Sequence, residues 1–288
     1  MRHLSRKVVL LLAPLLAATI LAAPQTPPTQ KASFEVASVK PSASGSRNFR
    51  FVSSGGRFSV TTITLLTLLK MAYQPQDGIA FLNSRIIGAP GWVDTDRFDI
   101  EATTEDASPG PIPREKLQPM LQSLLEDRFQ LKPHREVREM PVYFLTVGKG
   151  GAKLKLSEDQ SDPRAGQQPP NIPIEQRRGM IRRAGDGLVA NAVPLSFFTN
   201  FLSSQLGRPV LDKTGLEGVF DFKLTWTPSP FGGTPPVVLG AEAAPPSASD
   251  PSSPSIFTAI QELGLKLEAG KAPLEVLLID SVQKPSEN

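Results

Sequence analysis

The sequence contains no cysteine and only two histidines, His3 and His134. Without cysteine the chain has no disulfide to stabilise it, and no thiolate to serve as a nucleophile or a soft metal ligand. His3 lies in the expected leader, so the mature chain keeps a single imidazole, too few for a zinc site of the usual histidine type. We therefore expect no metal and no cofactor. We interpret His134 as a solvated or locally hydrogen-bonded residue.

Sequence motifs of known catalytic loops are also missing. No Gly-x-Ser-x-Gly sequence presents a serine nucleophile. Asp212-Lys213-Thr214-Gly215 shares letters with the phosphorylated loop of cation pumps and with penicillin-recognising enzymes, but their companion motifs are missing or in the wrong order. We interpret this segment as a turn in which Gly215 supplies a positive φ.

A long apolar run occurs at the N-terminus. Basic residues within positions 2–7 precede the run over 8–21, and alanines follow it at 22 and 23. The run is shorter than the ~20 residues of a membrane-spanning helix, so we predict a signal peptide over 1–23 and an extended tether over 24–32. An uncleaved anchor is the alternative. Cleavage would leave no stable membrane span and would place the chain in the periplasm or outside the cell.

Charge of one sign is not in excess once the leader is removed. The full chain has 31 Lys and Arg against 28 Asp and Glu, and Arg2, Arg6 and Lys7 belong to the leader. The mature chain is therefore formally neutral, and no basic cluster covers an expected folded segment. Because nucleic-acid binding normally uses such a cluster, nucleic acid is not an expected partner.

Two stretches are poor in periodic apolar residues. Residues 157–186 are rich in Gln, Pro, Arg and Gly, and residues 227–254 in Pro, Gly, Ala and Ser. Neither can bury enough apolar surface to offset the entropy of ordering. We predict a disordered linker over 157–186 and a Pro/Gly/Ser-rich insertion over 227–254. The predicted ordered parts are a first module over 33–156 and a second over 187–283, followed by a tail over 284–288.

The two modules show the same order of features, which indicates an internal duplication. Helices are indicated by apolar residues spaced at i, i+3, i+4 and i+7, and strands by alternating polarity. The features are helical faces that start at Leu65, Leu117, Leu195 and Phe257, and strands over 98–102, 142–147, 220–222 and 274–279. We predict an α+β fold of two tandem related β-α-β-α-β modules, with small mixed or antiparallel sheets and helices packed on one face. The alternative is a chance likeness between two ordinary α+β stretches.

Asp99 and Asp221 occupy matched positions in the two modules. Paired carboxylates can perform acid–base catalysis, so a hydrolase of envelope or extracellular polymers that uses Asp94, Asp99 or Asp221 is the alternative function. Strand alternation argues against it, because Phe98 and Ile100 would face the core and turn Asp99 toward solvent. We expect no catalytic residue.

Trp92, Tyr73 and Trp226 are the candidate ligand-binding residues. A groove between two modules is the default place for a ligand, and these aromatic side chains could line it. Ordinary core packing is the alternative that we favour for them. The expected role is non-enzymatic binding or interaction in the cell envelope, with sensing as one form of it, and the partner is an envelope protein or a small ligand.

Several segments occur in a recognisable order and spacing. They are 34–41 (FEVASVKP), 96–100 (DRFDI), 120–129 (MLQSLLEDRF), 212–216 (DKTGL), 279–280 (ID) and 284–288 (KPSEN). Together they resemble the soil-associated family of exported bacterial proteins of unknown function, over nearly all of the mature chain. The resemblance implies export, and since the family has no established catalytic residues it assigns none here. The rhythm of strands and helices is also similar to small interaction domains of secretins and TonB-dependent transducers, a likeness at fold level only.

Overall fold

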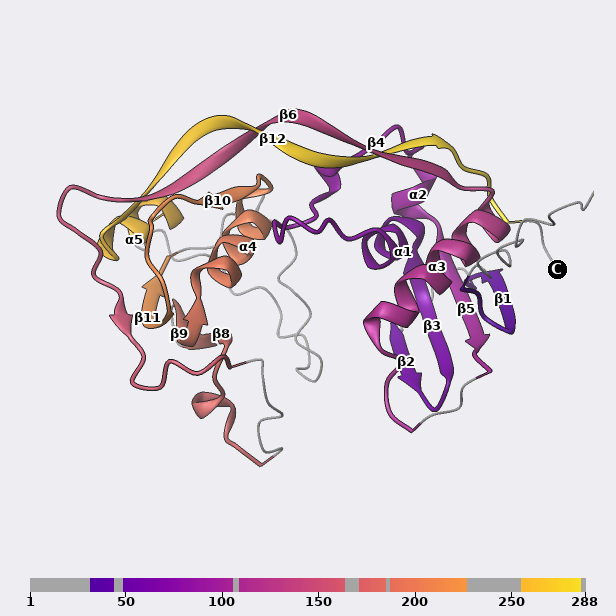
Figure 1. Ribbon diagram of the computed structural model, residues 1–288, viewed down its shortest axis with the longest axis horizontal. Coiled ribbons are helices and arrows are strands. Elements are labelled where there is room, and N and C mark those ends of the chain that lie inside the picture. The colour runs from indigo at the N-terminus through magenta and orange to yellow at the C-terminus, as the bar shows by residue number, and fades with distance from the viewer. Residues whose placement is uncertain are drawn as a thin grey trace, which may run out of the picture. The chain divides into compact units, whose positions relative to one another are not determined.

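The computed structural model describes residues 32–43, 49–105, 109–163, 171–184, 187–226 and 255–285 (Figure 1). From residue 32 onward the chain forms one unit by its backbone contacts. The predicted signal peptide, the tether up to residue 31, the insertion over 227–254 and the last three residues of the tail lie outside the described residues.

Within the described ranges the chain forms helices and strands in a mixed order, which confirms the predicted α+β class. The helices are α1 (Leu65–Ala72), η1 (Asn83–Arg85), α2 (Trp92–Thr95), α3 (Arg114–Phe129), η2 (Ile174–Gln176), α4 (Leu195–Leu206) and α5 (Ile256–Glu262). The strands are β1 (Val36–Pro41), β2 (Arg50–Ser54), β3 (Arg57–Thr64), β4 (Ile86–Ile87), β5 (Arg97–Thr103), β6 (Lys132–Val147), β7 (Lys155–Leu156), β8 (Met180–Ala184), β9 (Gly187–Pro194), β10 (Val210–Asp212), β11 (Val219–Thr225) and β12 (Leu265–Ser281).

The first sheet has the order β1-β5-β3-β2, and all neighbouring strands are antiparallel. Along β5, Phe98 and Ile100 are buried while Glu101 is exposed, so one face of the sheet meets the core. Helices α1 and α3 supply the other side of this first core. The Thr64 hydroxyl caps α1 by accepting the Thr67 N–H, which fixes where strand β3 turns into helix.

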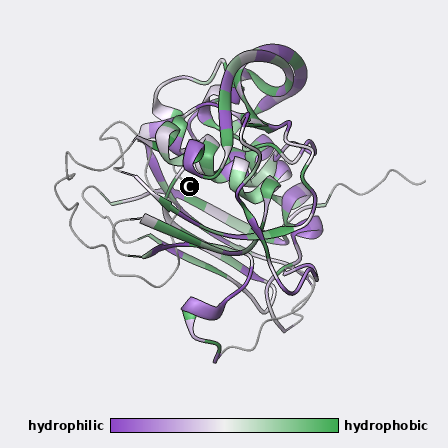
Figure 2. Ribbon diagram, turned by 90° about the vertical axis from the view of Figure 1, so that its left-hand side faces the viewer, coloured by the Kyte–Doolittle hydropathy of each residue, from purple (hydrophilic) through white to green (hydrophobic). Residues whose placement is uncertain are grey.

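The second sheet has the order β7-β11-β9-β8 and is likewise antiparallel. Phe220 and Phe222 of β11 are buried in a second core together with α4 and α5. Phe198 of α4 meets the Phe222 ring edge-on, with centroids 4.7 Å apart. Hydrophobic and hydrophilic residues alternate along the ribbons, as expected when helices cover one face of a sheet (Figure 2).

The third sheet is built on the two longest strands, β6 and β12, which run side by side and antiparallel (Figure 1). Its order is β10-β6-β12-β4, with parallel pairing at both edges. Strand β12 contributes to both cores: Leu265 at its start belongs to the second core, and Leu277 and Ile279 near its end belong to the first. Strand β6 contributes Leu145, near its end, to the second core. The first core is therefore completed by β12, which follows α4 and α5 in sequence, and the second core includes β6, which follows α1 and α3.

The structure differs from the predicted domain organisation on both sides of residue 157. Strand β7 falls inside the predicted first module, yet it pairs with β11 in the second sheet. The predicted disordered linker contains η2 and β8, and β8 pairs with β9 along its whole length. Composition missed β8 because an edge strand gains its hydrogen bonds from one neighbour and needs little apolar content of its own.

Strand β12 is also much longer than the predicted strand over 274–279. Gly270 and Pro273, which are residue types depleted in strands, interrupt the apolar pattern of its middle. Pairing with β6 continues through both positions. A Cβ added at Gly270 would lie 2.4 Å from the Phe144 ring, so any larger residue there would force that ring to move.

Arg85 is a fully buried arginine that the sequence analysis did not identify. Its Nε donates to the Glu275 carbonyl of β12 at 2.8 Å, and its Nη1 donates to the Ile79 and Ala80 carbonyls at 3.1 and 3.3 Å. Its Nη2 pairs with Asp77 Oδ2 at 2.5 Å. The guanidinium therefore fastens the chain between α1 and η1 to the middle of the long strand pair.

Candidate functional site

A carboxylate holds an irregularity in the second sheet. Ala192 in β9 has a φ of 48°, and the register between β9 and β11 shifts next to it. For a residue with a Cβ this left-handed conformation costs ~1–2 kcal/mol. Asp221 Oδ1 accepts the Ala192 N–H at 2.7 Å and the Ser157 hydroxyl at 2.5 Å. The carboxylate thus satisfies a backbone donor that the strand ladder leaves unpaired and stabilises the bulge.

The first sheet contains the same arrangement around Asp99. Asp99 Oδ1 accepts the Thr62 N–H at 2.8 Å and the Ser42 hydroxyl at 2.5 Å, and Thr62 has a φ of 61°. As strand alternation predicts, Asp99 and Asp221 lie on the faces opposite the cores. They are half-buried acceptors that stabilise bulges, however, and not freely solvated side chains.

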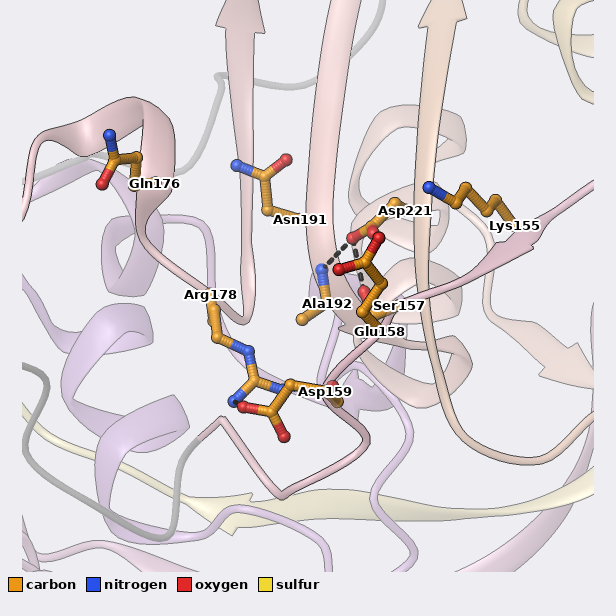
Figure 3. Close-up of a pocket in the computed structure, with 9 residues that line it drawn as sticks. All are labelled: Lys155, Ser157, Glu158, Asp159, Gln176, Arg178, Asn191, Ala192 and Asp221. Carbon is orange, nitrogen blue, oxygen red and sulfur yellow. Dashed lines mark hydrogen bonds and ion pairs between the residues drawn. The ribbon is translucent and has the colours of Figure 1, made fainter.

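A pocket of about 280 Å³ lies beside the second bulge, on the face of the second sheet that carries Asp221 (Figure 3). Strands β7, β9 and β11 and the chain between β7 and β8 provide its walls. The lining residues that the structure describes are Lys155, Ser157, Glu158, Asp159, Gln176, Arg178, Asn191, Ala192 and Asp221. All but Ala192 are polar, so the pocket suits a polar molecule.

Arg178 anchors the wall of the pocket that comes from the chain between β7 and β8. Its Nη1 donates to the Ser161 hydroxyl at 2.8 Å, and its Nη2 donates to the Asp159 carbonyl at 2.5 Å. Arg178 also forms an ion pair of 2.6 Å with the Asp159 carboxylate (Figure 3). Hydrogen bonds from the backbone and hydroxyl of Ser161, with the charge of Arg178, lower the pKa of Asp159 below its ordinary value.

Two amide side chains fasten the same segment to the sheet. Gln160 donates to the carbonyls of Ser157 and Val219 at 2.7 and 3.0 Å and accepts the Val219 N–H at 3.0 Å. Asn191 donates to the Glu175 carbonyl at 2.5 Å. The pocket walls are therefore held by hydrogen bonds at several points, which preorganises the groups that face the cavity.

The pocket depends on a segment that the first sheet does not match in length. The chain from Leu156 to Met180 connects β7 to β8, whereas the shorter chain from Pro41 to Arg50 connects β1 to β2. The pocket was not predicted because most of the longer segment has the composition of a disordered linker. Arg178 and Asp159 are the sequence features that could have indicated order in this segment, because an ion pair between opposite charges can hold a loop in place.

The predicted aromatic residues do not line this pocket. Tyr73 and Trp92 belong to the first core or pack against it, and Trp226 is buried in the second. Trp92 meets the Phe98 ring edge-on at 6.4 Å, and Trp226 meets Phe201 at 6.1 Å. These contacts agree with the core-packing interpretation, and a ligand-binding role for the three residues stays a prediction.

Tyr73 differs from the other aromatic residues because its polar atom is buried without compensation. Among the described residues, its hydroxyl has no hydrogen-bond partner. Burial, reinforced by the charge of Glu126, raises the pKa of this hydroxyl well above its ordinary value of 10.0. The phenol therefore stays protonated.

The remaining predicted residues lie away from the pocket. Asp94 is exposed on the short helix α2. His134 is half-exposed, and its Nδ1 lies 2.8 Å from Asp280 Oδ2, in agreement with a locally hydrogen-bonded histidine. Of the three predicted acids, Asp221 alone lines the pocket.

Most of the helices and strands described above lie in a segment that matches a protein family. Residues 66–282 match the family described as "Protein of unknown function (DUF3738)". The chain belongs to this family. No curated protein and no solved structure matches it. Membership in an uncharacterised family is thus confirmed, while soil association and export stay predictions.

The range that matches DUF3738 includes every residue that lines the pocket, whereas Ser42 and Thr62 of the first bulge precede it. Among the residues that the structure describes, no helix combines the length and apolar character needed to cross a membrane. Within the same ranges, no three His, Cys, Asp or Glu side chains are grouped so that they could hold a metal ion.

Proposed function

We propose that the chain is an exported, non-enzymatic binding or interaction protein of the cell envelope, with sensing as one form of that role. The observation that carries this proposal is the use of Asp99 and Asp221. Each Oδ1 accepts a serine hydroxyl and a backbone N–H at a strand bulge. These matched acids therefore have a structural role that explains their type and position without catalysis.

The placement of the acids further disfavours a hydrolase. Asp99 lies in the first sheet and Asp221 in the second, so the matched pair does not line a common pocket. Acid–base catalysis needs groups within hydrogen-bond reach of one reacting centre. At the pocket such a pair is formed by Ser157 and Asp221. The His134–Asp280 pair is half-exposed, and neither residue is among the described residues that line the pocket.

We infer that the two halves derive from duplication of one unit. The sheet orders β1-β5-β3-β2 and β7-β11-β9-β8 correspond strand for strand. The bulge contacts repeat, and so does a backbone bond: Ser42 N–H donates to the Arg97 carbonyl and Ser157 N–H to the Val219 carbonyl. The second unit differs by the longer segment that forms the pocket, so we place the binding function there.

Export is tested by fractionation of a bacterial host that expresses the full chain with a C-terminal tag. We expect the chain in the periplasm or the medium, shortened by removal of the leader. The matched variant Leu11→Arg interrupts the apolar run and should keep the chain inside the cell. Equal retention of both chains in the cytoplasm would refute export.

Binding is tested by capture of partners from envelope extracts and by a thermal-shift screen of small molecules on the full chain. An envelope protein or a ligand that raises the midpoint of thermal unfolding supports the proposal. Failure of both approaches contradicts it.

A hydrolase is the second candidate, favoured by the short Ser157–Asp221 hydrogen bond at the pocket. Turnover of glycan, peptide or ester substrates that is lost in Ser157→Ala, and kept in Ser42→Ala at the matching position of the first sheet, would support it. The thermal stability of both variants must be measured, because each serine also contributes to a bulge.

A further inference from the structure

We propose that the pocket of the second sheet binds a small zwitterion of the amino-acid or dipeptide type, with its ammonium group at Glu158 and Asp221 and its carboxylate at Lys155. This inference rests on the proposed binding function and names its site and ligand class. It starts from the charges in Figure 3, where groups of both signs surround one cavity.

Two exposed side chains of opposite charge lie on β7 and just after it. Lys155 and Glu158 both line the pocket, and among the described residues the side chain of neither has a hydrogen-bond or ion-pair partner. They do not form an ion pair with each other, although they lie close in sequence. Two opposite charges that flank a cavity without neutralising each other match a ligand that carries both charges at its ends.

Two side chains of the second sheet, Asp221 and Asn191, face the pocket with an acceptor oxygen. Asp221 uses Oδ1 for the bulge, and Asn191 uses its amide nitrogen for the Glu175 carbonyl. The second carboxylate oxygen of Asp221 and the amide oxygen of Asn191 have no partner among the described residues. Because both side chains are already fixed by other hydrogen bonds, an ammonium group can bind them with little loss of side-chain entropy.

The lining of the pocket disfavours other classes of ligand. None of the described lining residues is aromatic, so they offer no face on which a nucleobase could stack. Its lining is polar, unlike the mostly apolar pockets that hold hydrophobic ligands. Its volume of about 280 Å³ limits the ligand to a small molecule. The net charge of the described lining residues is negative, which favours a ligand with a free ammonium group over a simple anion.

The experiment uses the full chain and L-alanyl-L-alanine as the probe, with the common free amino acids as a second set. Binding is measured by isothermal titration calorimetry and by the amide resonances of Asn191 and Ala192. We expect the dipeptide to bind. N-acetylation of the probe removes its positive charge, and amidation removes its negative charge, so each change should weaken binding at least about tenfold through loss of one charged contact.

Variants of the protein locate the site. Glu158→Gln and Lys155→Gln alter exposed side chains and should leave thermal stability unchanged while weakening binding about tenfold. Lys153→Gln and Glu217→Gln remove charges from exposed residues outside the pocket lining and should bind as the unmodified chain does. Glu158→Gln should abolish the preference for the free amine over the N-acetylated probe.

The inference is wrong if neither alanyl-alanine nor any free amino acid at millimolar concentration shifts the Asn191 and Ala192 resonances. It is also wrong if binding occurs but the pocket variants bind as tightly as their controls. Capture of an envelope partner that persists in Glu158→Gln would leave the proposed function standing and reject the pocket as its site.

Discussion

Replacement of Arg85 by methionine should reduce the free energy of unfolding by about 4 kcal/mol. Methionine keeps the length of the stem but removes a guanidinium that is completely buried. The Glu275, Ile79 and Ala80 carbonyls lose their charged donor, and Asp77 loses its ion-pair partner. Breaking a buried pair by removing one partner costs ~3–5 kcal/mol. A domain is stable by only ~5–15 kcal/mol, so the loss is large.

Two further variants separate the contributions. Asp77→Asn should cost less, about 1–2 kcal/mol, because Arg85 keeps its three carbonyl acceptors and the Asp77 side chain is partly exposed. Arg85→Lys should lie between the two, since one ammonium group cannot reproduce the fork of the guanidinium. Arg57→Met is the control: its ion pair with Glu101 is exposed, and its loss should cost less than ~1 kcal/mol.

The assay is urea unfolding of the full chain, followed by far-UV circular dichroism and by tryptophan fluorescence. Trp92 and Trp226 report on the first and second cores respectively. Because Arg85 holds the long strand pair through Glu275, both signals should shift to lower urea together. If Arg85→Met stays within about 1 kcal/mol of the unmodified chain, this account of the buried guanidinium is refuted.

Three other predictions concern backbone and burial. Gly264→Ala should destabilise the fold by about 3 kcal/mol or more, because its Cβ would lie 2.0 Å from the Gly151 carbonyl oxygen. Gly215 has nearly the same φ but lies in open space, so Gly215→Ala should cost only about 1 kcal/mol. Equal midpoints of urea unfolding for the two variants would contradict the steric explanation. Ala192→Gly should stabilise the chain by about 0.5–1 kcal/mol by relieving its left-handed φ, measured as a higher midpoint of thermal unfolding. Tyr73→Phe should stabilise it by about 1 kcal/mol, because the buried hydroxyl lacks a partner. Since the folded state raises the pKa of Tyr73, its protonated form contributes stability that is complete below pH 10.0 and declines at higher pH, so the advantage of Tyr73→Phe should grow as pH rises above 10.0.

Much of the fold follows from local sequence patterns. The spacing of Leu65, Leu68 and Leu69 predicts α1, and all three are buried in it. The alternation around Phe98 predicts which face of β5 meets the core. These predictions hold because a helix or strand that covers one core repeats its apolar residues at the period of its own geometry.

The third sheet could not be predicted in this way. Pairing of β6 with β12 joins residues far apart in sequence, and their middle parts contact each other more than either core. The buried Arg85 was missed for a related reason, since its partner Glu275 lies on β12. Single-sequence periodicity reports burial against a local neighbour and contains no information about such distant contacts.

The candidate site was predicted only in part. The match of Asp99 with Asp221 drew attention to the two bulges, of which Asp221 alone lines the pocket. In sequence, a carboxylate that accepts a backbone N–H at a bulge shows the same alternation as a solvated carboxylate. The pocket was missed because its walls at Glu158 and Arg178 come from a segment with few apolar residues. Hydrogen bonds and an ion pair order that segment, and composition does not measure them.

The contribution of the long C-terminal strand β12 to both cores has a consequence for protein synthesis. The ribosome releases the first helices and the whole first sheet long before it makes Leu277 and Ile279, which the first core contains. The core of the N-terminal half therefore stays incomplete until β12 has emerged from the ribosome. A chain that is exported before it folds would gain from this delay. Premature termination anywhere before β12 would leave both halves unfinished.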